Sequence, residues 1–199
     1  MNIIDACRVI ALSRNDAVLV STMRAMYAFD KLDQGQPRLN AVPLMGGAPS
    51  MGLGIALAQP ERKVIIVDGD ASLLMQLGGL VTVANQQPKN FYHFVIFNGT
   101  QFTGISNLPI PGVNQFDFAG LAKAAGYKAV YSYSTLDELQ DGMSEILGQQ
   151  GPVFVVLHVE PDPPAYPAKP LKDFADHHFT RMGEEAQMLQ DLLTSRPIP

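Results

Sequence analysis

The sequence predicts an α/β fold of three layers, a doubly wound and mostly parallel sheet with helices on both faces. Short runs made almost only of apolar residues, such as VIIV at 64–67 and PVFVVLHV at 152–159, are typical of strands buried on both faces of a sheet. These runs alternate along the chain with longer segments in which apolar residues recur every three or four positions, as in helices. Such alternation is typical of right-handed βαβ units, in which the strands are parallel.

The N-terminal half supplies the first of these elements. They are a short helix at 5–12, a strand at 17–21, a helix at 22–32 capped by Thr22, a loop at 33–42, a strand at 64–67 and a helix at 72–85. Between them, LMGGAPSMGLGIALAQ at 44–59 combines many glycines with apolar residues. It predicts a loop that leads into a tightly packed helix, because Gly52 and Gly54 let a neighbouring backbone come close.

The C-terminal half continues the alternation. Its expected elements are a strand at 92–97, a helix at 115–125 closed by Gly126, a strand at 129–133, a helix from the capping box of Thr135 and Glu138 to about Gly148, and a strand at 152–159. The proline-rich segment at 161–170 is expected to wrap over the surface, and the tail at 173–193 to be helical. We expect a single domain over 1–199, with a core at about 17–159 and a C-terminal extension at 160–199.

The composition argues against several classes of protein. The 199 residues carry 14 Lys and Arg against 19 Asp and Glu, so a net charge of −5 leaves no basic excess for nucleic acid. Cys7 is the single cysteine, which excludes an intrachain disulfide, a cysteine-based zinc site and a resident iron–sulfur cluster. Without a secretion signal or a run of about 18 apolar residues, we expect a cytoplasmic protein that does not span a membrane. Nine methionines fit either a partner-covered surface or a well-filled core.

Groups able to bind a metal stand directly after two of the buried strands. The strand at 64–67 runs into Asp68-Gly69-Asp70, and the strand at 92–97 runs into Asn98-Gly99-Thr100. Ligands of parallel α/β sheets bind at the carboxyl ends of the strands, and the 28 positions between Asp70 and Asn98 accommodate one helix and one strand. A carboxylate, an amide oxygen and a backbone carbonyl suit Mg²⁺ or Ca²⁺ together with phosphate oxygens. The helix start after Ser72 adds free N–H groups, so the sequence predicts a metal-bridged diphosphate site.

The paired segments Gly69-Asp70-Ala71-Ser72 and Phe97-Asn98-Gly99-Thr100, with the upstream run MGGAPSMGLGIALAQ, resemble the cofactor signature of thiamine-diphosphate-dependent decarboxylases. The resemblance covers about 17–159 and concerns the diphosphate-binding domain of that family. It is greatest to the small beta subunit of sulfopyruvate decarboxylase and to the C-terminal half of phosphonopyruvate decarboxylase.

This resemblance implies roles for individual residues. Asp70 and Asn98 would bind Mg²⁺ through their side chains, and Thr100 through its carbonyl oxygen. Met45 would be the apolar wedge under the central ring of thiamine diphosphate, and Gly46 and Gly47 would line the aminopyrimidine pocket. The full set implied to bind the cofactor is Met45, Gly46, Gly47, Gly69, Asp70, Ala71, Ser72, Asn98 and Thr100. Gln101, Phe102 and Thr103 would either face the substrate or pack the loop.

Two positions depart from the family pattern. Ala71 stands where the turn usually has a second glycine, and Phe97 replaces the first asparagine of the usual pair. Weaker metal binding or a degenerate site therefore stay open at this point.

The resemblance also implies a partner. In the family, a glutamate on a separate pyrimidine-binding domain activates the cofactor, and the chain is too short to hold that domain as well. We therefore expect no catalytic residue on this chain and a pyrimidine-binding alpha-type subunit beside it, in an α2β2 or larger assembly. The expected activity is decarboxylation of a small 2-oxoacid, with sulfopyruvate or phosphonopyruvate suggested by the nearest resemblance. The alternatives are a beta subunit of an oxoacid:ferredoxin oxidoreductase and a degenerate, non-catalytic subunit that stabilises a partner.

Other polar or reactive residues predict structural roles. His93 and His158 lie in apolar strands and are expected in the core, whereas His177 and His178 lie in a mixed polar tail and are expected at the surface or an interface. Asp68 is expected to be structural, and Cys7 to be a small packing residue, because no positive environment for a thiolate is evident.

Overall fold

The structure is a computed structural model that describes residues 1–42, 44–164 and 176–195. Its main sheet has six strands in the order β2-β1-β3-β4-β8-β7, and every neighbouring pair is parallel. The strands are β1 (Val18–Ser21), β2 (Arg38–Asn40), β3 (Val64–Gly69), β4 (Phe91–Phe97), β7 (Ala129–Tyr133) and β8 (Val153–His158). The predicted parallel α/β fold is therefore confirmed.

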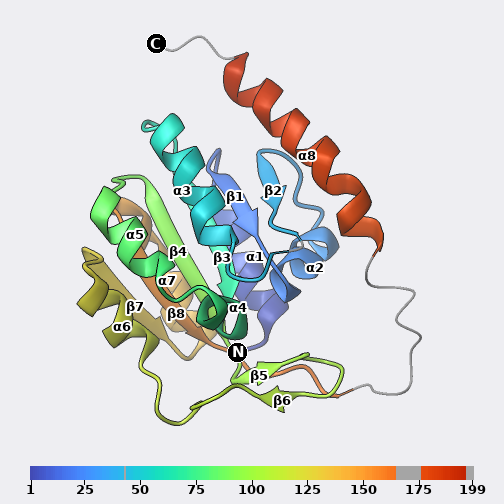
Figure 1. The fold of residues 1–199 in the computed structure, drawn as a ribbon, viewed down its shortest axis with the longest axis vertical. Coiled ribbons are helices and arrows are strands. Elements are labelled where there is room, and N and C mark those ends of the chain that lie inside the picture. Colours follow the sequence, from blue (N-terminus) through green and yellow to red (C-terminus); the bar gives the residue numbers. More distant parts are fainter. Residues whose placement is uncertain (43, 165–175, 196–199) are drawn as a thin grey trace.

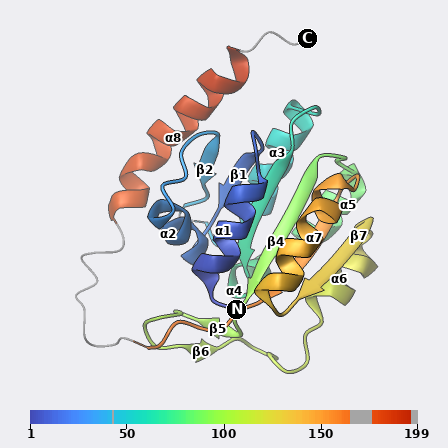
Figure 2. The same cartoon turned by 180° about the vertical axis from the view of Figure 1, so that it is seen from behind.

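Helices cover both faces of this sheet (Figures 1 and 2). One face carries α1 (Ile3–Ser13), α2 (Arg24–Lys31) and α7 (Leu136–Gly148), and the other carries α3 (Ala48–Ala58), α4 (Asp70–Met75), α5 (Gly79–Gln86) and α6 (Phe118–Ala125). In β3, Ile65 and Val67 join the core under α1, whereas Ile66 joins the core under α3. Both faces of the strand are dry, which explains the uninterrupted apolar run at 64–67. Within the described ranges, no helix combines the length and apolar character needed to cross a bilayer.

Several local expectations are confirmed. The capping box of α7 forms, since Thr135 Oγ1 accepts the N–H of Glu138 at 3.3 Å and Glu138 Oε2 accepts the N–H of Thr135 at 3.0 Å. Gly126 ends α6 with a φ of +109°, a conformation that glycine adopts without steric cost. The helix expected in the tail is α8 (Asp176–Thr194), although 165–175 lie outside the described residues, so most of the proline-rich segment is not tested.

Other local expectations are wrong. The expected loop at 33–42 contains β2, a three-residue strand that pairs with β1. The single helix expected at 72–85 is two helices, α4 and α5, separated near the adjacent glycines Gly78 and Gly79, which disfavour helix. Thr22 does not cap α2, because its hydroxyl donates to the carbonyl of Ala41 at 3.2 Å. A small hairpin of β5 (Thr100–Gln101) and β6 (Leu108–Pro109) was not expected.

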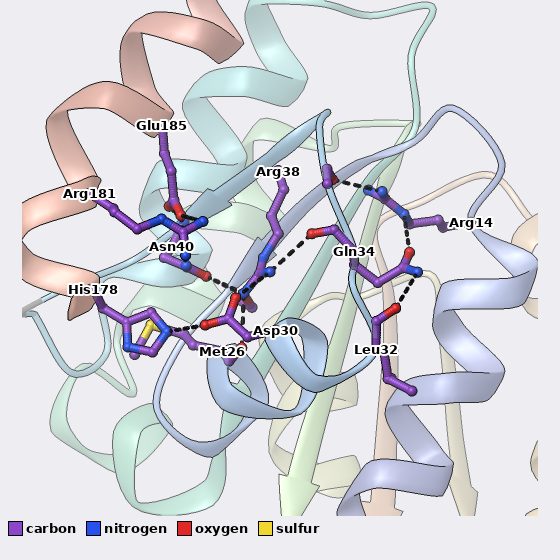
Figure 3. Close-up of polar contacts among 12 residues, drawn as sticks. Arg14, Met26, Asp30, Leu32, Gln34, Arg38, Asn40, His178, Arg181 and Glu185 are labelled. Atoms are coloured by element: carbon purple, nitrogen blue, oxygen red, sulfur yellow. Dashed lines mark hydrogen bonds and ion pairs between the residues drawn. The ribbon is translucent and has the colours of Figure 1, made fainter. Parts of the chain in front are cut away.

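A buried polar cluster docks α8 on the edge strand β2 (Figure 3). Glu185 accepts hydrogen bonds from the backbone N–H and the side-chain amide of Asn40, both at 3.2 Å. Asp30 receives His178 Nε2 and Arg38 Nη1, each at 2.7 Å. Burial alone would raise the pKa of Asp30, but the charge of Arg38 and these hydrogen bonds outweigh it and hold that pKa below its usual value. His178 is only 3% exposed, so the expectation of a surface or interface position is wrong for His178, and the side chain of His177 lies outside the described part.

Gly52 sets the close approach of α3 to β3. A Cβ at Gly52 would lie 2.5 Å from Ile66 Cγ1, and Ile66 is fully buried. We expect Gly52→Ala to lower the free energy of unfolding by about 1–3 kcal/mol, as overpacking does. The close approach expected at Gly54 is wrong, because a Cβ there meets nothing within 4 Å. Gly54→Ala is therefore the matched control, and it should raise stability by about 0.5–1 kcal/mol. Urea unfolding measures both variants, and equal midpoints would contradict the close contact.

Candidate functional site

A cavity of about 330 Å³ opens at the carboxyl ends of β1, β3 and β4. The chain leaves β1 toward β2 on one side and later leaves β3 toward β4 on the other, so the winding direction of the sheet reverses between β1 and β3. Ligands of open α/β sheets bind in the crevice at this reversal. The cavity brings together most of the predicted site residues, namely Met45, Gly69, Asp70, Ala71, Ser72, Asn98, Thr100, Gln101, Phe102 and Thr103.

Asp70 is the centre of this arrangement. It begins α4 directly after β3 and is 2% exposed. Its Oδ2 accepts the backbone N–H groups of Asn98 at 3.0 Å and Gly99 at 2.7 Å, while its Oδ1 accepts the N–H of Ala71 at 2.7 Å. Burial raises the pKa of Asp70 to about 6, although these hydrogen bonds oppose the rise. Direct hydrogen bonds thus join the carboxyl ends of β3 and β4, as predicted from the sequence.

Asn98 and its neighbours form a compact set of oxygen atoms. Asn98 Oδ1 accepts the N–H of Thr100 at 2.8 Å and the Thr100 hydroxyl at 3.0 Å. The Asn98 amide donates to Thr103 Oγ1 at 2.9 Å, and the Thr103 hydroxyl lies 3.3 Å from the carbonyl oxygen of Thr100. Asn98 and Thr100 therefore stand in one turn, and Asp70 at the start of α4 accepts hydrogen bonds from the backbone of that turn.

This donor set fits Mg²⁺ only together with a bound molecule. In the described part of the chain, no group of three His, Cys, Asp or Glu side chains gathers in a way that could hold a metal ion. Mg²⁺ is typically held by one or two carboxylates, with phosphate oxygens and water completing six positions. A single buried carboxylate at Asp70, beside amide and carbonyl oxygens and a cavity, has that character.

The glycine-rich loop reaches the site through Ser72. Gly46 donates its backbone N–H to Ser72 Oγ at 2.8 Å, so Ser72 joins this loop to the turn after β3. Gly46 has a φ of +84°, and a Cβ there would lie 2.8 Å from Gln76 Cβ, which explains why glycine is needed. Neither Gly46 nor Gly47 is part of the cavity lining, whereas Met45 is, so their expected place in an aminopyrimidine pocket stays a prediction.

The two departures from the family pattern have local explanations. Ala71 lies in helical backbone at the start of α4, a conformation that alanine favours. Phe97 packs its ring 5.3 Å from that of Phe118 and 5.3 Å from that of His158, and it does not line the cavity. Neither substitution removes an oxygen atom from the cavity.

Histidine environments differ from one another. His93 is fully buried as expected, with Nε2 3.6 Å from Asp68 Oδ2 and Nδ1 3.4 Å from the Tyr127 hydroxyl. His158 is half-buried and lies 2.9 Å from Ser132 Oγ, so its expected core position is only partly correct.

The sequence reasoning did not identify the part of the lining that follows β1. Thr22, Met23 and Arg24 line the cavity, together with Tyr27 from α2. The signal that could have found them is their position at the carboxyl end of a buried strand, the same rule that identified Asp70 and Asn98.

Comparison with known proteins agrees with this geometry. The phosphonopyruvate decarboxylase of Streptomyces viridochromogenes is 39% identical over 159 residues, which are 77% of this chain and 38% of that protein. The sulfopyruvate decarboxylase subunit beta of Methanothermobacter thermautotrophicus is 38% identical over 117 residues, which are 59% of each chain. The chain therefore spans less than two thirds of these relatives.

A solved structure and a family description complete the comparison. Benzoylformate decarboxylase from Polynucleobacter necessarius has the same fold, with a TM-score of 0.64 at 21% identity over 81% of this chain and 33% of that one. Residues 21–157 match the family described as thiamine pyrophosphate enzyme, C-terminal TPP binding domain. The match covers more than half of the 199 residues and includes every residue that lines the cavity except Ile3. The chain belongs to this family of thiamine pyrophosphate enzymes and carries its C-terminal TPP-binding domain.

Proposed function

We propose that the chain is the beta-type subunit of a two-chain, thiamine-diphosphate-dependent 2-oxoacid decarboxylase. It would work with an alpha-type subunit that carries the pyrimidine-binding domain, in an α2β2 or larger assembly. The observation that carries the proposal is the buried Asp70 carboxylate, hydrogen-bonded to the Asn98–Gly99 turn at a cavity. Relatives named as a phosphonopyruvate decarboxylase and a sulfopyruvate decarboxylase subunit beta support the reaction and the partner.

Each residue of the site has a task in this proposal. Bound thiamine diphosphate supplies the carbanion and the electron sink for decarboxylation. Asp70, Asn98 and the Thr100 carbonyl would hold Mg²⁺, while Ala71 and Ser72 would hold the diphosphate. The Ser72 hydroxyl accepts a hydrogen bond from Gly46 and keeps its own proton to donate. Gln101, Phe102 and Thr103, on the hairpin beside the cavity, would face the substrate.

Two rival functions are less well supported. An oxoacid:ferredoxin oxidoreductase would need an electron acceptor and coenzyme A, whereas both relatives described above are named as decarboxylases. A degenerate subunit would be expected to lose donor atoms from the site, but Asp70, Asn98 and Thr100 all line the cavity.

Purification of the tagged chain from its native host tests the proposal. We expect a second polypeptide to co-purify, with thiamine diphosphate and Mg²⁺ in the sample. The complex should release CO2 from sulfopyruvate or phosphonopyruvate without an electron acceptor. A chain that purifies alone and holds no cofactor would favour the degenerate subunit instead.

Met45 offers a prediction about turnover. Met45 lines the cavity, and we expect Met45→Ala to leave thiamine diphosphate bound but to lower kcat by about 10–100-fold, because the cofactor would no longer be held in its reactive shape. Met188→Ala is the matched control, since Met188 is 56% exposed on α8. Steady-state kinetics and cofactor content of both complexes decide the matter. Equal turnover in the two variants would remove Met45 from the proposed role.

A further inference from the structure

Arg24 has no role in the function proposed above. It begins α2 just after β1, and its side chain lines the cavity. Among the described residues of that lining, it is the one cationic side chain. A cation placed in a cavity between strand ends attracts anions, and its effect is strong where the surroundings exclude water.

The guanidinium of Arg24 is only partly paired. One Nη2 contact goes to the carboxylate of Asp162, on the segment that follows β8. The Nε atom is buried and, within the described residues, has no hydrogen-bond partner. A buried donor without an acceptor costs free energy, so the guanidinium keeps a hydrogen-bonding capacity that its contact with Asp162 does not use.

The surroundings of Arg24 hold it at the cavity. A Cβ at Gly104, whose φ is +77°, would lie 3.5 Å from Arg24 Nη2. Asn107 accepts the N–H of Gly104 at 2.7 Å and donates to the backbone carbonyl of Asp162 at 2.8 Å. The guanidinium thus lies between the loop that joins β5 to β6 and the segment at Asp162.

We infer that Arg24 is the anion-binding residue of this cavity, and that its guanidinium binds oxygen atoms of a phosphate-like group. A guanidinium presents parallel N–H donors that match two oxygens of a phosphate, phosphonate or sulfonate. Asp162 holds the side chain in place and competes with the ligand for Nη2. The group has two possible sources, the diphosphate of the cofactor or a phosphonate or sulfonate on the substrate. This inference rests on the proposed function and deepens it.

Variants of the co-purified complex test the inference. If no partner co-purifies, the same variants of the full chain are used. The variants are Arg24→Gln, Arg24→Lys and Asp162→Asn, with Arg8→Gln as the control, since Arg8 pairs with Asp5 on α1 and does not line the cavity. Calorimetry measures the Kd of thiamine diphosphate with Mg²⁺ and of methylphosphonate and methanesulfonate as substrate probes. Kinetics compare the KM of phosphonopyruvate and sulfopyruvate with that of pyruvate, which has no second anionic group.

We expect Arg24→Gln to weaken the binding of one of these anions by about 10–100-fold, because a charged hydrogen bond is lost. The affinity of Arg24→Lys should lie between those of wild type and Arg24→Gln. Asp162→Asn should bind the same anion more tightly, because the competing carboxylate is gone. A purely structural role would not give opposite signs. Weaker binding of thiamine diphosphate, together with an effect on every substrate, identifies the cofactor diphosphate as the group that Arg24 binds. A higher KM for phosphonopyruvate or sulfopyruvate alone identifies the phosphonate or sulfonate of the substrate.

Other outcomes would overturn the inference. They are binding within twofold of wild type for every anion in both Arg24 variants, or a change of the same sign in Arg24→Gln and Asp162→Asn. The binding measurements need no turnover. If wild type decarboxylates no 2-oxoacid but Arg24→Gln still weakens anion binding, the proposed function fails while the role of Arg24 stands.

Discussion

Replacing Asp70 by alanine is expected to abolish Mg²⁺-dependent retention of thiamine diphosphate by the assembled enzyme. The substitution removes the carboxylate of the proposed metal site and leaves the N–H groups of Asn98 and Gly99 without their acceptor. Residues that merely support a metal ligand change affinity by 10–100-fold, so loss of the ligand itself should cost about 100-fold or more. Titration of Mg²⁺ against cofactor bound to the gel-filtered complex measures this loss.

Asp70→Asn separates metal binding from folding. It keeps the size of the side chain and one acceptor oxygen but removes the negative charge. We expect this variant to assemble with its partner and still fail to retain the cofactor, while EDTA produces the same loss in wild type. Added Mg²⁺ should restore wild type and neither variant. Retention at the wild-type level in both variants would refute the assignment of Asp70 to the metal.

The chain by itself should not decarboxylate any 2-oxoacid, even with excess thiamine diphosphate and Mg²⁺. No glutamate is found among the described residues that line the cavity, and the proposed function assigns the activating glutamate to the partner. Loss of one acid–base group slows a reaction by about 10²–10⁴-fold, and here the aminopyrimidine pocket would be missing as well. CO2 release is the measurement, with and without the partner.

The partner provides the control for that experiment. Wild-type partner should restore CO2 release, and a partner with its activating glutamate replaced by glutamine should restore cofactor binding without restoring turnover. Measurable decarboxylation by the pure chain would contradict the split site.

The strands buried on both faces were predictable because burial imposes an apolar residue at nearly every position. β3 and β8 are clear examples. β2 does not follow this rule, since only Leu39 of its three residues is apolar, and Asn40 is bonded to Glu185, 145 positions further along the chain. Contacts over that distance leave no local pattern in the sequence.

The site was predictable where a motif and a strand end coincided, as at Asp70 and Asn98. Arg24 follows a strand end but belongs to none of the motifs identified in the sequence. The position of its side chain depends on contacts with Asp162 and Gly104, which come from distant segments of the chain. The break between α4 and α5 was missed because the apolar periodicity runs on through adjacent glycines, which are weak but not absolute helix breakers.

The hydrogen bonds along β2 also restrict how copies of this protein can associate. The N–H of Arg38 donates to Gln36 Oε1 at 2.9 Å, and the N–H of Asn40 donates to Glu185 Oε2 at 3.2 Å. An incoming strand from another molecule would find these donors already satisfied and α8 in its way (Figure 1). Helix α8 therefore prevents strands of other molecules from extending the sheet at its edge strand β2, as they do in fibrils.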